Sequence, residues 1–159
     1  MRQILLLTLL SIFFSKTYSE EALVRVSAKI LIPLKVEVTQ HLNFGDIFKG
    51  GKNFSAKETG ELKVSGNGRV RLLWKDSLNT EYQSIEKGLK VALSNNKGNS
   101  FNVTVSPTSL GNLHDFTVTE NNDKIVKIGG RIDSLDKSLP EGDYSGSILI
   151  RAEYLNDWF

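Results

Sequence analysis

Apolar and polar residues alternate along the stretch from Val24 to Val38. Every even position in it is apolar and most odd positions are polar, with Leu31 and Pro33 as the exceptions. Side chains alternate between the two faces of a strand, so this pattern puts one apolar stripe on one side and argues against a helix. The stretch is long for a single strand, and Pro33 cannot donate a ladder hydrogen bond. We therefore predict two strand segments joined at a kink near Pro33.

Short alternating runs recur after this stretch, with turn residues between them. Gly66-Asn67-Gly68 predicts a hairpin, because these residues tolerate positive φ. Glycines inside other runs predict a bend at Gly45-Asp46 and a bulge at Gly129-Gly130. No run has a sustained helical period, so we expect an all-β, immunoglobulin-like antiparallel β-sandwich of about nine short strands. The later predicted strands cover residues 61–65, 69–75, 89–93, 101–105, 116–118, 124–132 and 143–154.

The first nineteen residues have the pattern of a secretory signal peptide. Arg2 precedes an apolar run from Ile4 to Phe14, and Thr17-Tyr18-Ser19 places small residues where a signal peptidase requires them. The apolar run is too short to span a bilayer, so cleavage before Glu20 is expected rather than anchoring. We therefore expect a signal peptide at residues 1–19 and one sandwich domain over residues 20–159. We expect no membrane span in the mature chain.

Composition narrows the classes of partner. The sequence contains no cysteine, which excludes disulfides, thiol nucleophiles and thiolate metal sites. Removal of Arg2 and Lys16 from the 20 basic residues leaves 18, against 18 acidic residues. This neutral balance argues against nucleic acid or an anionic membrane as a partner.

Catalytic and metal-binding patterns are not found in the sequence. His41 and His114 have no second histidine or carboxylate cluster at metal-ligand spacing, and no nucleophile stands in a recognised motif. We therefore expect a protein that is not an enzyme and holds no cofactor and no metal. Trp74 is expected to anchor the core, while Tyr82 is the better candidate for an exposed aromatic contact.

Two motifs lie near the ends of the predicted domain. The first is Pro33-Leu34 followed by Leu42-Asn43-Phe44-Gly45, and the second runs from Leu139 to Gly146 as Leu-Pro-Glu-Gly-Asp-Tyr-Ser-Gly. Together they resemble a bacterial family of small exported Ig-like proteins of unknown function. More distantly, the chain is similar to major subunits of the α-type (class 5) fimbriae assembled by chaperone and usher. The residues that carry the resemblance are Pro33, Leu34, Leu42, Phe44, Gly45, Leu139, Pro140, Gly142, Tyr144 and Gly146.

The resemblance implies assembly by strand complementation, in which the N-terminal segment of one subunit fills a groove in the next. The donor would be Glu20 to Lys29, with four side chains pointing into the neighbour: Ala22, Val24, Val26 and Ala28. The implied role is that of a pilin-like fimbrial subunit involved in cell adhesion, and the implied location is the periplasm, followed by the cell surface or a fimbrium. Its implied partners are copies of itself or related subunits, a periplasmic chaperone and an outer-membrane usher.

Two other interpretations stay open at this point. In one, Glu20 to Lys29 is the domain's own first strand, and the protein is a monomeric periplasmic or surface module that binds a glycan or a protein through loops such as 76–87. In the other, the chain is a membrane barrel. The barrel is less favoured, because several runs are shorter than the roughly 9–11 residues of a membrane-spanning strand.

Overall fold

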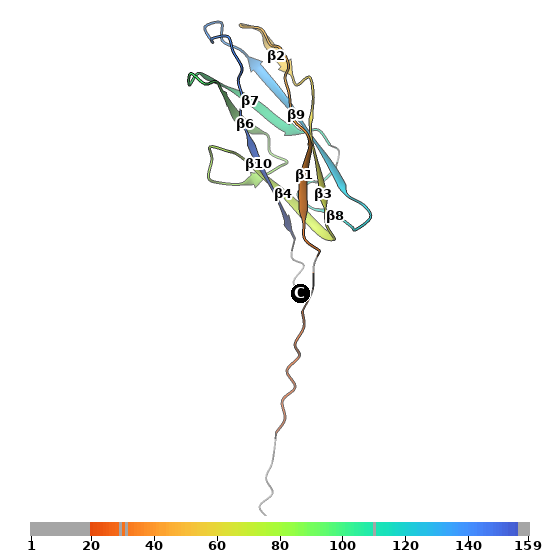
Figure 1. Cartoon of the computed structure of the whole chain (residues 1–159). Helices are drawn as coiled ribbons and strands as arrows, with labels where there is room; N and C mark the ends of the chain where they lie inside the picture. The colour runs from red at the N-terminus through yellow and green to blue at the C-terminus, as the bar shows by residue number, and fades with distance from the viewer. Residues whose placement is uncertain (1–19, 29, 31, 110, 156–159) are drawn as a thin grey trace, which may run out of the picture. The chain divides into compact units, whose positions relative to one another are not determined.

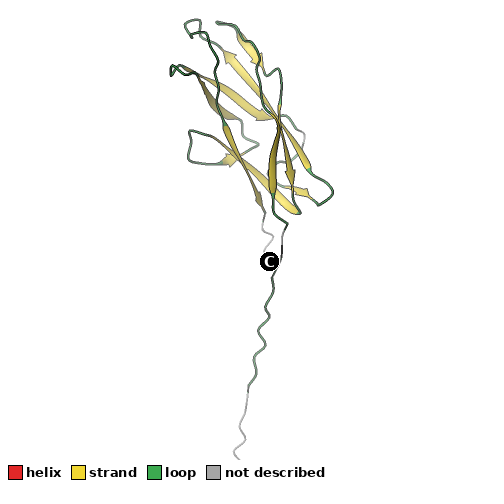
Figure 2. Ribbon diagram, in the orientation of Figure 1, coloured by secondary structure: helices red, strands yellow, loops and turns green. Residues whose placement is uncertain are grey.

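The computed structural model describes residues 20–28, 30, 32–109 and 111–155. These residues contain ten strands in two antiparallel sheets and no helix (Figures 1 and 2). The expected all-β antiparallel sandwich is thereby confirmed. The chain divides into two compact units, Met1–Ile30 and Leu31–Phe159, and all ten strands belong to the second. The predicted signal peptide, residues 1–19, lies outside the described residues.

The strands form one larger and one smaller sheet. The larger has six strands in the order β1-β3-β9-β7-β6, with β2 also paired to β9. Their bounds are β1 (Lys35–Gln40), β2 (Lys52–Ser55), β3 (Gly60–Ser65), β6 (Leu89–Ser94), β7 (Ser100–Pro107) and β9 (Lys124–Ser134). The smaller has the order β10-β4-β5, with β8 also paired to β4. Its strands are β4 (Gly68–Asp76), β5 (Gln83–Ser84), β8 (Phe116–Val118) and β10 (Ile148–Tyr154).

The apolar core lies between the two sheets. Val70, Leu72 and Trp74 on β4 are all fully buried, as their alternation predicts. Trp74 also donates a hydrogen bond from Nε1 to the Lys87 carbonyl oxygen at 3.0 Å, so the expected core anchor is confirmed. The larger sheet faces it with a second set of buried residues: Leu62, Val64, Val91, Val103, Val105, Val126, Ile128 and Ile132.

The strand predicted over Val24 to Val38 is only partly present. Its last part forms β1, where Val36 and Val38 alternate with charged residues. The described residues of 20–34 belong to no strand, so the first of the two predicted segments is wrong for these residues. A strand requires a neighbour for its backbone N–H and C=O groups, and no pairing is assigned to this part of the described chain.

The turn at Gly66-Asn67-Gly68 joins the two sheets and does not form the predicted hairpin. Strand β3 pairs with β1 and β9, whereas β4 pairs with β10, β5 and β8. A Cβ atom on Gly66 would lie 2.6 Å from the hydroxyl oxygen of Tyr154. Glycine leaves room here for the Tyr154 hydroxyl, which accepts a hydrogen bond from the neighbouring Asn67 amide.

The bulge predicted at Gly129-Gly130 is also wrong. In the β7–β9 ladder, Val105 faces Gly130 and Ser106 faces Gly129 without a change of register. A Cβ atom on Gly130 would lie 2.6 Å from Cζ of Phe44. The glycine thus makes room for an aromatic ring that packs against the strand.

The last strand, β10, begins at Ile148, whereas the predicted strand begins at Asp143. The difference arises because the chain crosses from the larger to the smaller sheet between these two residues. Ser145 and Ser94 exchange backbone hydrogen bonds of 3.0 and 2.8 Å at the β6 edge of the larger sheet. Pairing with β4 in the smaller sheet begins only at Ile148. Gly146 lies at this crossing, where a Cβ atom would be 2.5 Å from the carbonyl oxygen of Ala92.

Candidate functional site: an uncovered groove between two edge strands

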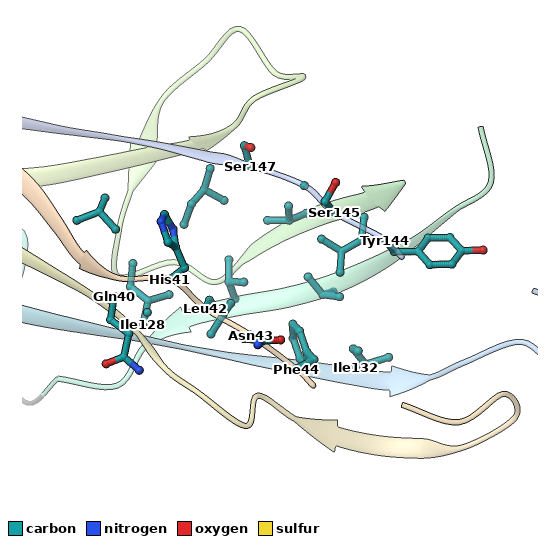
Figure 3. A pocket seen from close by; sticks show the side chains of 18 of the residues that line it. Gln40, His41, Leu42, Asn43, Phe44, Ile128, Ile132, Tyr144, Ser145 and Ser147 are labelled. Carbon is teal, nitrogen blue, oxygen red and sulfur yellow. The ribbon is translucent and has the colours of Figure 1, made fainter. Parts of the chain in front are cut away.

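A groove of about 970 Å³ opens between β1 and β10. One wall is β1 with the chain that follows it to Ile47, and the other is the chain from Gly142 to Ile150 (Figure 3). Most of the residues lining it are apolar: Val36, Val38, Leu42, Phe44, Ile47, Leu62, Val91, Leu93, Phe101, Val103, Val105, Ile128, Ile132, Ile148, Leu149 and Ile150. The groove thus has the size and the lining of a site for an apolar segment.

Both walls of the groove are edge strands. Within the described chain, β1 pairs only with β3, and β10 pairs only with β4. An edge strand presents a row of backbone N–H and C=O groups that can pair with a further strand. Because β1 and β10 belong to different sheets and both line the groove, a strand inserted there could extend the sandwich beside either edge.

Tyr154 shows how the two edges run relative to each other. Its hydroxyl donates to the Ile32 carbonyl oxygen at 2.7 Å and accepts from the Asn67 amide at 3.0 Å. The end of β10 therefore lies beside the chain that leads into β1, and the two edges run in opposite directions. One end of the groove is at Val36 and Ile150, and the other is at Ile47 and Gly142.

Val38 shows that the core is not fully covered at the groove. It faces Leu62 in the β1–β3 ladder, and directly paired residues lie on the same side of a sheet. Leu62 is only 2% exposed, whereas Val38 is 58% exposed. A side chain on the core side of the sheet is thus left in contact with solvent.

The first motif forms part of one groove wall. Leu42 and Phe44 are half-buried and line the groove, while Leu34 packs against the core. Gly45 has a φ of +67°, and its amide donates to the Asn43 side chain at 2.9 Å. The bend predicted at Gly45-Asp46 is therefore confirmed; Pro33 is exposed just ahead of β1.

The second motif builds the corner at which the chain enters the other wall. The Tyr144 hydroxyl donates to the Pro140 carbonyl oxygen at 2.9 Å, and its ring lies 5.2 Å from that of Phe101. Gly142 has a φ of +145°, and Leu139 packs against the core. With Gly146 at the sheet crossing, the motif shapes this wall of the groove.

The four predicted donor residues lie outside any strand in this chain. Ala22, Val24, Val26 and Ala28 are exposed, Val26 to 93%. Ile30 continues their apolar series and is 96% exposed. The segment thus offers a row of apolar side chains that its own unit leaves uncovered.

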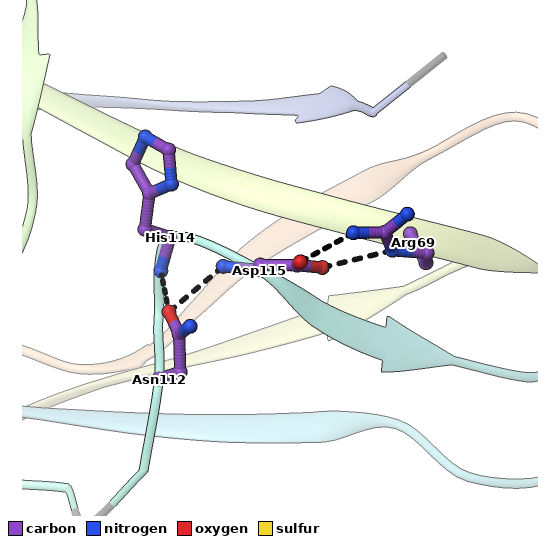
Figure 4. Close-up of polar contacts among 4 residues, drawn as sticks. All are labelled: Arg69, Asn112, His114 and Asp115. Atoms are coloured by element: carbon purple, nitrogen blue, oxygen red, sulfur yellow. Dashed lines mark hydrogen bonds and ion pairs between the residues drawn. The ribbon is translucent and has the colours of Figure 1, made fainter. Parts of the chain in front are cut away.

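The histidines take part in no metal cluster. His41 lines the groove and His114 is exposed; among the described residues, no three His, Cys, Asp or Glu side chains are grouped to hold a metal ion. Asn112 accepts from the amides of His114 and Asp115 at 2.8 and 2.9 Å, which caps the turn (Figure 4). Asp115 in turn accepts from Arg69, at 3.0 Å from Nε and also from Nη2.

The pairing of Asp115 with Arg69 predicts a contribution to stability that depends on pH. The hydrogen bonds from Arg69 hold the pKa of Asp115 below its usual range. A carboxyl whose pKa is lower in the folded state stabilises the fold above its unfolded pKa, and this stability is lost as the pH falls through the folded value. We expect Asp115→Asn to lower the urea midpoint at pH 7 and to show a smaller further loss below about pH 4.

The measurement is the urea unfolding midpoint of both proteins from pH 7 to pH 3. The control is Glu120→Gln, since the Glu120 carboxylate makes no hydrogen bond or ion pair with the described residues. Identical pH profiles for Asp115→Asn and the parent would show that the Arg69 pair does not contribute.

Tyr82, the predicted aromatic contact, is half-buried on the outer face of the smaller sheet. The guanidinium carbon of Arg151 lies 4.0 Å from its ring centroid, and Nζ of Lys75 lies 5.0 Å from it. The ring thus ties the short β5 to β4 and β10 through cation–π contacts.

Sequence reasoning did not identify most of the groove. It placed Leu42 and Phe44 in a motif but gave no role to Phe101, Val38 or Ile148 as groove residues. The available signal was alternation, which marks a residue as facing the core but does not show whether a second layer covers it.

Comparison of the sequence with models of known protein families finds no match, and comparison with curated proteins finds none either. In the part of the chain that the structure describes, no helix is long and apolar enough to cross a bilayer. The functional conclusion therefore rests on the groove and on the exposed apolar segment.

Proposed function

We propose that the protein is an exported, pilin-like structural subunit that assembles at the cell surface by strand complementation. The N-terminal segment of one copy, or of a related subunit, inserts between β1 and β10 of the next. The observation that carries the proposal is the uncovered apolar groove, above all the 58% exposure of Val38 opposite the buried Leu62.

The exposed segment has the length and pattern that the groove requires. The groove wall covers residues 142–150, and the exposed segment over residues 20–28 has the same number of residues, so a donor strand can extend along that wall. Burial of Ala22, Val24, Val26 and Ala28 would contribute at most about 8 kcal/mol before the costs of ordering and association. Backbone hydrogen bonds along the edge add to this.

An open groove has to be protected before assembly. Bare edge strands beside an apolar surface pair with other chains and aggregate. A periplasmic chaperone that lends a strand would cover the groove, and an outer-membrane usher would exchange that strand for the N-terminal segment of the next subunit. These partners follow from the proposed assembly and from the resemblance to fimbrial subunits.

Val26→Asp tests the proposal in the chain that begins at Glu20. An aspartate at a donor position cannot enter an apolar groove without a large desolvation cost, so we expect multimers to be lost. The measurement is molar mass by light scattering during gel filtration, with circular dichroism to confirm that the monomer is folded.

The matched control is Ser27→Asn, which adds a polar side chain of the same shape without charge at the adjacent position, on the other side of the donor strand. It is expected to assemble like the parent. Multimers of unchanged size from Val26→Asp would overturn the proposal.

A second candidate function is a monomeric binding module for a glycan or protein. The favouring observation is the surface formed by Tyr82, Lys75 and Arg151, next to the 45%-exposed Leu149 on β10. A parent chain that stays monomeric with a folded domain, at concentrations up to the millimolar range, would favour this function over assembly.

A further inference from the structure

The charged side chains that line the groove are of one sign. Asp46, Glu61 and Asp143 are among the lining residues, together with His41, while the described lining contains no lysine and no arginine. A low-dielectric groove with acidic groups at its rim attracts a segment that carries basic ones.

Two of these carboxylates lie at the same end of the groove. Asp46 precedes Ile47 on one wall, and Asp143 follows Gly142 on the other. The loops that carry them are joined by an ion pair between Lys49 and Glu141 at 3.1 Å. We call Asp46 and Asp143 the acidic mouth.

The carboxylates of the acidic mouth are not neutralised by the described residues. Both residues are exposed, and neither side chain has a hydrogen bond or an ion pair within the described chain. Glu61 differs, because it accepts from the Thr39 hydroxyl at 3.1 Å and lies 3.9 Å from Lys127. Lys49 is paired with Glu141, and the stem of Lys57 lies beside Gly45, next to Asp46, without forming an ion pair with it.

The exposed N-terminal segment has a matching distribution of charge. Its beginning is acidic, at Glu20 and Glu21, and its later part is basic, at Arg25 and Lys29. These basic residues occupy odd positions, so they flank the apolar row that would enter the groove. Both side chains are long enough to place a charged head at the rim while the stem lies along apolar surface.

We infer that Asp46 and Asp143 select the incoming segment by its basic residues and thereby set its direction. The end that carries Arg25 and Lys29 lies at the acidic mouth, and Glu20-Glu21 lies at the opposite end, beside Val36 and Ile150. This inference rests on the proposed strand complementation.

In the inferred direction the inserted segment runs antiparallel to β10 and parallel to β1, because β1 and β10 run in opposite directions. The edge with the antiparallel, slightly more stable pairing is therefore β10. At the opposite end, Lys35 and Glu37 form a 2.8 Å ion pair with each other.

A charge exchange in the full mature chain tests the inference. We expect Asp46→Lys with Asp143→Lys to slow assembly about tenfold at low salt. Adding Arg25→Glu and Lys29→Glu to the same chain is expected to restore most of the rate. The measurement is the rise of light scattering after dilution from denaturant, at about 0.05 M and 1 M salt, where screening should remove the difference.

Direction is measured separately by cross-linking, since the chain has no cysteine of its own. A copy with Asp143→Cys is mixed with a copy that carries either Ile30→Cys or Ala22→Cys. The disulfide-linked pair is expected with Ile30→Cys and not with Ala22→Cys.

The outcomes separate the inference from the proposed function. If Val26→Asp abolishes multimers while the charge variants assemble at the parental rate, or the Ala22→Cys pair forms instead, the selection by charge is overturned and the complementation stands. If Val26→Asp assembles normally, the complementation itself fails.

Discussion

Replacement of Trp74 by alanine is expected to lower the free energy of unfolding by about 3–5 kcal/mol. The side chain is fully buried in the second half of β4, between Leu72 and Asp76, and it faces the larger sheet. The substitution leaves a large cavity and removes the hydrogen bond to the Lys87 carbonyl oxygen, which anchors the chain after β5. A loss of this size is a large part of the stability of a typical domain.

The measurement is urea unfolding followed by circular dichroism, with Phe48→Ala as the control. Phe48 is also aromatic but is 76% exposed, so its loss is expected to change stability by less than about 0.5 kcal/mol. Similar costs for the two substitutions would contradict the position of Trp74 in the core.

Gly146→Ala is expected to be the most damaging small substitution in the second motif. Its Cβ atom would lie 2.5 Å from the carbonyl oxygen of Ala92 and 2.9 Å from Cδ2 of Leu93. Because the first of these atoms belongs to the backbone of β6, it cannot move aside as a side chain can. The chain crossing between the sheets must shift, at a cost of about 1–3 kcal/mol or more.

The matched control is Gly88→Ala, which adds the same methyl group where the nearest atom is 3.6 Å away. That variant is expected to differ from the parent by less than about 1 kcal/mol. Thermal unfolding of the three proteins makes the comparison, and equal melting temperatures for Gly146→Ala and the parent would contradict the close approach.

Alternation along the chain was a reliable guide to the strands that are packed on one face. Val70, Leu72 and Trp74 of β4 and Leu89 and Val91 of β6 were predicted by it and are buried. It succeeds because each such strand has one face on the core and one on solvent. The two-residue β5 is too short to show any period.

Turn chemistry was a weaker guide, because the same residues serve different connections. Gly66-Asn67-Gly68 has the composition of a tight hairpin turn, but here it links strands of different sheets. At Gly129-Gly130 the absence of side chains makes room for the Phe44 ring, and the β7–β9 ladder contains no extra residue. In both places a distant side chain decides the geometry, and a local pattern does not contain that information.

Of the two parts of the candidate site, the apolar N-terminal segment could be predicted from the sequence and the groove could not. The apolar series through Val24 and Val26 shows in the sequence, and it led to the expectation of a segment that has to be covered. The groove depends on which edges of the two sheets are left without a neighbour, which is fixed by pairings between segments far apart in the chain. Asp46 and Asp143, nearly a hundred positions apart, come to one end of the groove for the same reason.

The central place of β9 has a consequence for how the chain reaches its native state. This strand pairs with β2, β3 and β7, and it comes late in the sequence, at Lys124–Ser134. Strands made early must therefore wait for a distant partner, and such topologies fold slowly, on the order of milliseconds to seconds. The larger sheet can therefore be completed only after β9, in the last third of the chain, has been made.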